Sequence, residues 1–84
     1  MSRVRKNYIL FKTEPKKEPV LAGSFSSMKR AREAIREDSS MTAIHEKGEF
    51  TIELLDNGGN LWNEGKLIRE YKICCVIEDI FIGG

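Results

Sequence analysis

The chain has few of the residues that build metal centres and disulfide frameworks. Its 84 residues include one histidine and two cysteines. The cysteines, Cys74 and Cys75, are neighbours, so they cannot join distant parts of the chain, and a disulfide between them would be strained. A structural zinc site takes about four ligands, and the chain has no Cys-x-x-Cys pair to begin one. We therefore expect no metal, no cofactor and free thiols in a reducing compartment.

Long apolar runs are also missing. A bilayer span needs about 20 consecutive apolar residues, and no segment approaches this length. The first residues, Met1–Lys6, lack the long apolar core of a signal peptide. These absences predict a cytoplasmic protein without a membrane partner.

No catalytic motif is visible. His45 has neither a cysteine partner nor a second histidine, and we expect it on a short surface strand. Gly58-Gly59 is not a phosphate-binding loop, because no Gly-Lys-Ser or Gly-Lys-Thr follows it. Catalysis needs a nucleophile, a base and an oxyanion site, whereas the serines of this chain occur where caps and turns are expected. We expect a protein that is not an enzyme and has no catalytic residue.

What the chain does have is an uneven distribution of charge. Residues 1–36 contain ten basic and three acidic residues, a net charge of +7. Residues 37–84 contain four basic and ten acidic residues, a net charge of −6. The formal total of +1 hides this dipole, which points to an electrostatic partner or to pairing of the two halves. If the first strand pairs with the last, acids and bases interleave, and the helix and the hairpin tip keep their charge.

The basic part of the chain predicts a hairpin followed by a helix. Tyr8–Thr13 and Val20–Phe25 read as strands, separated by a turn that contains two prolines. Ser26 or Ser27 can cap the following helix, and Asp38-Ser39-Ser40 is expected to end it. The apolar side of this helix recurs at spacings of three and four residues and consists of Met28, Ala31, Ala34 and Ile35.

The acidic part of the chain predicts further strands. Phe50–Leu54 alternates strictly between apolar and polar residues, as a strand with one buried face does. Asp56–Asn60 is rich in Asn and Gly and reads as a turn. Leu67–Ile77 reads as a long strand, whose inward residues would be Leu67, Tyr71, Ile73, Cys75 and Ile77.

These elements predict one domain over residues 1–84, because a chain of this length has room for a single core. Residues 1–7 would form a flexible basic arm, residues 8–82 the globular part and residues 83–84 a flexible tail. Segregated strands and helix favour the α+β class. We expect a single helix packed on one face of a four- to five-stranded antiparallel sheet in ββαββ order. An exposed edge of such a sheet could also support a homodimer.

Two groups of basic residues are the candidate binding residues. They lie off the apolar stripe of the helix and at the hairpin tip, and they are Lys29, Arg30, Arg32, Arg36, Lys16 and Lys17. Lys29 and Glu33, four residues apart, are expected to pair. Clustered cations attract phosphate backbones through counterion release. This favours a non-enzymatic module that binds a nucleic acid or a nucleic-acid-binding protein. The alternative is an ordinary solvated face with acids of the later strands beside these cations.

A second hypothesis uses the acidic part of the chain. An acidic sheet surface can occupy the basic groove of a nucleic-acid-binding protein, which would make this chain a protein-binding inhibitor. Trp62, the only tryptophan, lies in a polar segment that reads as a loop. It would be either an interface anchor for that partner or a lid that folds back onto the core.

Two resemblances suggest further functions. The order of hairpin, helix and strand, the segment Gly59–Ile73 and the terminal Gly83-Gly84 resemble ubiquitin-like proteins. This resemblance covers about fifteen residues and the tail, and it implies a carrier conjugated through its C-terminal diglycine. The segment between the helix and Phe50 departs from that pattern. In size and architecture the chain also resembles small accessory proteins of phages and mobile elements, which implies an inhibitor such as an anti-CRISPR protein.

Overall fold

The protein is an α+β domain of one helix and five strands. The structure, a computed structural model, describes the backbone of residues 2–81 and the side chains of residues 5–77. In chain order the elements are β1 (Ser2–Thr13), β2 (Val20–Phe25), α1 (Met28–His45), β3 (Phe50–Leu55), β4 (Gly58–Asn63) and β5 (Lys66–Phe81). The tail predicted at residues 83–84 lies outside the described residues.

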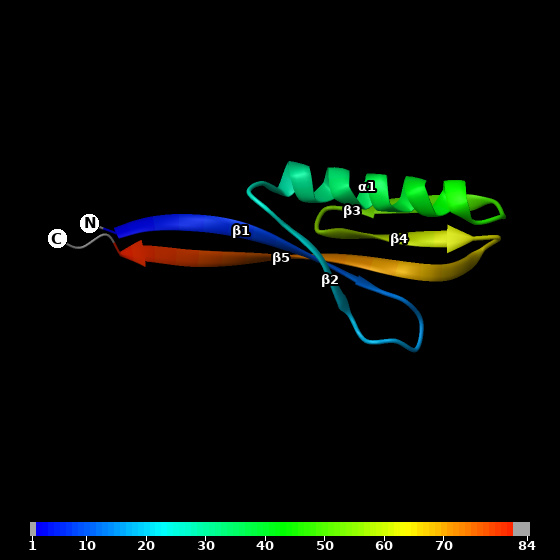
Figure 1. Cartoon of the computed structure of the whole chain (residues 1–84), viewed down its shortest axis with the longest axis horizontal. Coiled ribbons are helices and arrows are strands. Elements are labelled where there is room, and N and C mark those ends of the chain that lie inside the picture. The colour runs from blue at the N-terminus through cyan, green and yellow to red at the C-terminus, as the bar shows by residue number, and fades with distance from the viewer. Residues whose placement is uncertain (1, 82–84) are drawn as a thin grey trace.

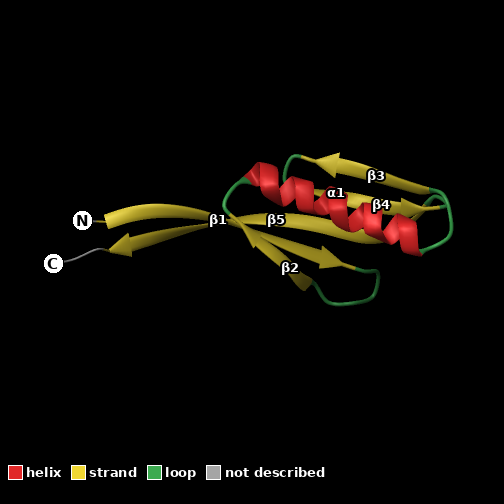
Figure 2. Cartoon of the chain, turned by 45° about the horizontal axis from the view of Figure 1, so that its top comes forward, coloured by secondary structure: helices red, strands yellow, loops and turns green. Residues whose placement is uncertain are grey.

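All five strands form one antiparallel sheet in the spatial order β2-β1-β5-β4-β3. The α+β class and the single helix on one face are confirmed, as Figure 2 shows. The predicted ββαββ order is wrong, because β4 makes the chain order ββαβββ.

The additional strand β4 occupies a segment that the sequence analysis assigns to a turn and a loop. A side chain at Gly58 would place its Cβ 2.2 Å from the carbonyl oxygen of Tyr71 on the neighbouring strand. A Cβ at Gly59 would lie 3.5 Å from Cγ2 of Ile35 on α1. The glycines therefore permit close packing of β4 against β5 and the helix, and only Asp56 and Asn57 separate β3 from β4.

Helix α1 begins as predicted but ends later. The hydroxyl of Ser27 caps its first turn by accepting a hydrogen bond from the N–H of Arg30 at 3.2 Å. The helix runs through Asp38-Ser39-Ser40 to His45. Side-chain hydroxyls in this stretch bond within the helix, since Ser39 donates to the carbonyl oxygen of Arg36 and Thr42 to that of Asp38. His45 is therefore exposed on the last helical turn, not on a strand.

The core lies between α1 and the covered face of the sheet. Its buried apolar residues are Leu10, Ala31, Ile35, Leu61, Tyr71 and Ile73, with Met28 and Ala34 packed against them. Ala31 and Ile35 are fully buried, which confirms the predicted apolar stripe. Small Ala31 lets the helix axis approach the sheet closely. No helix within residues 2–81 is long and apolar enough to span a membrane.

The longest feature is the ladder between the first and last strands. β1 pairs with β5 from Ser2 opposite Phe81 to Thr13 opposite Glu70. β1 thus begins at Ser2, where the sequence analysis expects an arm, and pairs well before Tyr8. Residues 2–7 of β1 and residues 76–81 of β5 pair with neither β2 nor β4. They form a two-stranded ribbon that projects from the body (Figure 1). The molecule consequently measures 57 × 24 × 20 Å.

Candidate functional site

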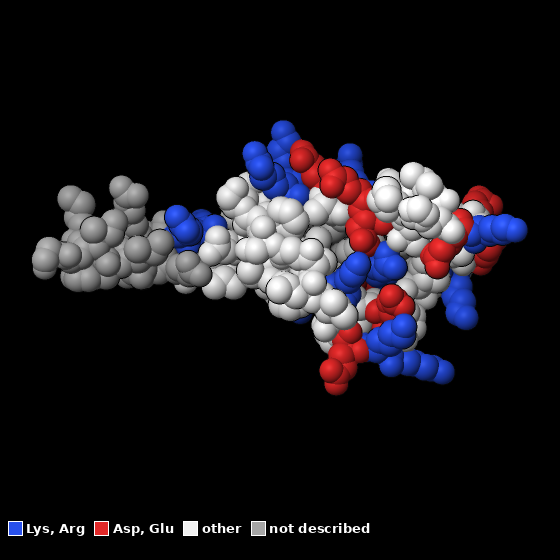
Figure 3. All heavy atoms as spheres, viewed as in Figure 1, with Lys and Arg blue, Asp and Glu red and all other residues white. Residues whose placement is uncertain are grey.

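The strongest candidate for a binding surface is the basic face of α1, which consists of Lys29, Arg30, Arg32 and Arg36. Three of these side chains are exposed, and Arg32 is half-buried. Figure 3 shows lysine and arginine side chains gathered over the first turns of the helix. These cations lie off the apolar stripe, as predicted, because the opposite side of the helix carries the buried Ala31.

A shallow depression runs beside this basic face, between α1 and β3. It encloses about 310 Å³ and is lined by Met28, Lys29, Arg32, Glu33, Arg36 and Leu54. Lys29, Arg32 and Arg36 are separated by three and four residues, the spacing that puts side chains on one side of a helix. The sequence thus brings three cations together at the rim of one hollow, with a single acid, Glu33, among them.

The basic face is not neutralised by ion pairs. Among residues 5–77 the ion pairs involve Lys12, Lys17 and Arg69 as the cations. The predicted pair of Lys29 with Glu33 does not form. The first turn of α1 contains no acid, and the N-terminal end of a helix is itself partly positive. Among the described residues, no acid of the later strands therefore lies within ion-pair distance of these four cations.

The hairpin tip lies apart from the basic face. Lys16 and Lys17 are both exposed in the turn between β1 and β2, which projects away from α1 (Figure 1). Lys17 pairs with Glu14 at 3.3 Å, and Lys16 has a positive φ of 63°. The six predicted binding residues therefore form two separate groups, of which only the helical group is free of an ion pair.

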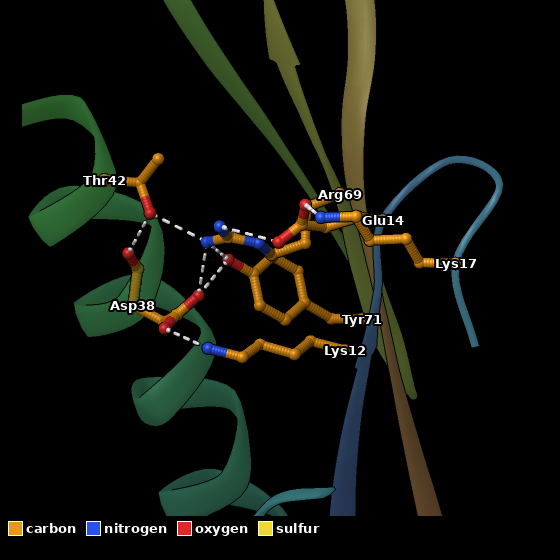
Figure 4. A network of polar contacts seen from close by, with 7 residues as sticks. All are labelled: Lys12, Glu14, Lys17, Asp38, Thr42, Arg69 and Tyr71. Carbon is orange, nitrogen blue, oxygen red and sulfur yellow. Dashed lines mark hydrogen bonds and ion pairs between the residues drawn. The ribbon is translucent and has the colours of Figure 1, made fainter. Parts of the chain in front are cut away.

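A polar network joins the second half of α1 to the sheet (Figure 4). Its centre is the carboxylate of Asp38, which accepts hydrogen bonds from the phenol of Tyr71 at 2.5 Å and from Nη1 of Arg69 at 2.8 Å. Lys12 pairs with the other carboxylate oxygen at 3.3 Å. Nη1 of Arg69 also donates to the hydroxyl of Thr42 at 2.7 Å.

The network changes the acidity of its members. Burial favours the neutral form of Asp38, but the hydrogen bond from Tyr71 and the charges of Lys12 and Arg69 outweigh it and lower the pKa of Asp38. Burial, together with the hydrogen bond to Asp38, raises the pKa of Tyr71. The arrangement has no nucleophile paired with a base, and each charged head has a partner. Its role is to fix the helix on the sheet.

This network is not predicted from the sequence, although the sequence contains one signal for it. Arg69 occupies an inward position of β5, between Leu67 and Tyr71, in the alternation that was used to choose the inward residues. A cation on a covered sheet face requires an acidic partner. Only the folded chain shows that this partner is Asp38, 31 residues away.

Trp62 lies within β4 rather than in a loop. It is half-buried, and its register neighbours are Thr51 on β3 and Leu67 on β5. It is not among the partly buried apolar side chains that pack against the described core. The lid and the interface anchor both stay predictions.

Within the described part of the chain, no three histidine, cysteine or acidic side chains are grouped closely enough to hold a metal ion. Comparison of the chain with family models, with curated proteins and with solved structures finds no match.

Proposed function

We propose that the protein is a non-enzymatic module that binds nucleic acid through the basic face of α1. The observation that carries this proposal is that Lys29, Arg30, Arg32 and Arg36 form no ion pair with any acid of residues 5–77, although eight acids follow them within that range. A solvated face of no function would be expected to lie beside some of those acids.

The chemistry of this surface suits phosphate groups. Arginine binds phosphate oxygens through a planar fork of donors, and three of the four cations are arginines. From Lys29 to Arg36 the helix rises about 10 Å, which is comparable with the axial length of three base pairs. Each neutralised phosphate releases counterions, so affinity would come from the backbone and depend little on base sequence.

A charge-reversal experiment tests the proposal. The variant Arg30→Glu/Arg32→Glu/Arg36→Glu is compared with Lys47→Glu/Lys66→Glu/Lys72→Glu, which makes the same change in net charge at exposed lysines elsewhere. Binding to a labelled random duplex of about 20 base pairs is followed by fluorescence anisotropy over a range of salt concentrations. The helix variant should lose most of its affinity, and its salt slope should fall by about one unit per lost phosphate contact.

The control variant should keep its salt slope, with a modest loss of affinity from the altered net charge. Equal effects of the two variants, or an unchanged affinity of the helix variant, would show that the basic face is not the binding surface. A second arm captures partners from a lysate with and without nuclease. A partner that survives nuclease treatment and still requires the basic face would be a protein, contrary to the proposal.

A further inference from the structure

The free edge of β5 differs from every other edge of the sheet. β4 pairs with β5 only as far as Lys72, and the N–H of Ile73 donates to the carbonyl of Asn57 at 2.8 Å. From Cys74 to Phe81 the backbone of β5 has a neighbour on the β1 side alone. Eight residues of strand, about 26 Å, thus offer unpaired backbone groups.

The free edge of β5 also exposes apolar side chains. Val76 is 42% and Ile77 is 64% exposed, and they point to opposite faces of the ribbon. Residues 73–77 carry no charge at all. An exposed edge with an uncharged, apolar stretch of this kind is the kind that pairs with another strand.

The other edges carry the features that discourage pairing. The free part of β1, residues 2–7, contains Arg3, Arg5 and Lys6. β3 carries Glu53 and is flanked by acids at both ends. β2 follows Pro19, contains Gly23 and is distorted by a bulge against β1. Charges, proline and bulges protect these three edges, and within residues 2–81 the edge of β5 lacks them between Cys74 and Ile77.

We infer that a second copy of the chain pairs along this edge, β5 against β5 in antiparallel orientation. A two-stranded ribbon is marginally stable in water, and pairing would make it the middle of a four-stranded sheet. A two-fold axis through Ile77 pairs residues 74–80 of the two copies without meeting β4. In that register Ile77 of one copy lies opposite Ile77 of the other, and Val76 lies opposite residue 78, so an apolar contact forms at the axis.

This register makes a charge-specific test. A glutamate at position 76 would lie opposite the acid at residue 78 of the second copy, whereas a lysine there would lie opposite an unlike charge, and its partner within the chain is the neutral Asn7. The variants are Val76→Glu and Val76→Lys, with Val20→Glu on β2 as the matched control. Val20 is likewise an exposed valine of an edge strand, 56% exposed against 42% for Val76. Sedimentation equilibrium at several concentrations measures the mass, and circular dichroism confirms folding.

The wild type and the β2 variant should reach twice the 9.6 kDa chain mass as concentration rises. The glutamate variant should raise the dissociation constant of the dimer about tenfold or more, and the lysine variant should raise it much less. A monomeric wild type would overturn the inference. So would dissociation by the β2 variant, or equal dissociation by the lysine and glutamate variants.

Amide hydrogen exchange supplies a readout that a dimer formed elsewhere would not change. Protection of the amides of residues 75, 77 and 79, which point to the same side as that of Ile73, should increase with protein concentration, because edge pairing uses these N–H groups, whereas the amides between them already face β1. A concentration-dependent dimer that leaves them unprotected would also overturn the inference. Neither result bears on the basic face of α1, which is tested separately.

Discussion

The phenol of Tyr71 on β5 donates a hydrogen bond of 2.5 Å to the carboxylate of Asp38 in the middle of α1. The two residues are 33 positions apart, so the bond joins the last strand to the only helix of residues 2–81. This bond holds the second half of the helix on the sheet, and the buried Ala31 and Ile35 hold the first half. The basic face is thereby presented on a helix that both apolar and polar contacts hold on the sheet.

Replacing Asp38 with asparagine should destabilise the fold. The side chain keeps its shape but loses the charge that balances Arg69, whose side chain is only 15% exposed, and Lys12. We expect a loss of about 1–2 kcal/mol in the free energy of unfolding, measured with urea at pH 7. Asp56→Asn, at an exposed turn residue, is the control and should change it by less than about 0.5 kcal/mol. Equal costs would mean that the network does not stabilise the helix position.

The stability of the wild type and that of Asp38→Asn should respond differently to acid. The pKa of Asp38 is lower in the folded chain than its ordinary value near 4, so the ionised form is preferred by the folded state. Its contribution is therefore present above about pH 5 and is lost as the pH falls through the folded value. The stability difference between wild type and Asp38→Asn should be constant from about pH 7 to 5 and shrink below about pH 4. A difference independent of pH would contradict a charged role for Asp38.

Tyr71 should govern stability at alkaline pH. Burial and the bond to Asp38 raise the pKa of its phenol above the ordinary value near 10, so the unfolded chain loses this proton first. Stability from this group is complete below about pH 10 and is lost as the pH rises further. Tyr71→Phe should be less stable than wild type at pH 7, and its melting temperature should fall less steeply above about pH 10. Parallel curves for the two proteins would refute this assignment.

The helix shows which part of the fold could be predicted from local sequence. The cap at Ser27 and the buried stripe depend on neighbouring residues, and both are confirmed. The end of the helix depends on distant ones, because Asp38 is held by side chains of β1 and β5. An acid followed by two serines is typical of a helix end, and tertiary contacts override that tendency here.

The candidate site divides in the same way. That Lys29, Arg30, Arg32 and Arg36 lie off the buried stripe follows from helical periodicity alone. Whether acids of the later strands neutralise them depends on the register of the sheet, which periodicity does not determine. The structure pairs β1 with β5, so Arg5 lies opposite Glu78, and part of the charge split is undone on the ribbon. The four cations of α1 form no such pairs among the described residues and keep their positive charge.

Strand β4 provides a prediction about glycine. Its two glycines were assigned to a turn, yet both are buried and neither has a positive φ. Gly58→Ala would place a Cβ 2.2 Å from the carbonyl oxygen of Tyr71, which must move, whereas Gly59→Ala meets the carbonyl oxygen of Glu53 at 2.9 Å. We expect Gly58→Ala to cost more than about 2 kcal/mol and Gly59→Ala about 1–2 kcal/mol. Thermal unfolding of both variants gives the order, and the reverse order would contradict this packing.

Glu33 offers the sharpest local test of the basic face, because its carboxylate lines the same depression as Lys29, Arg32 and Arg36. An acid at this place repels phosphate, so Glu33→Gln should increase affinity for duplex DNA about two- to threefold at low salt. Glu18→Gln makes the same change in net charge at an exposed residue of the hairpin turn and should have a smaller effect. Anisotropy titrations of both variants at one salt concentration measure the difference. If the two variants gain affinity equally, net charge rather than the basic face attracts the duplex, and if Glu33→Gln gains nothing, phosphate does not approach this depression.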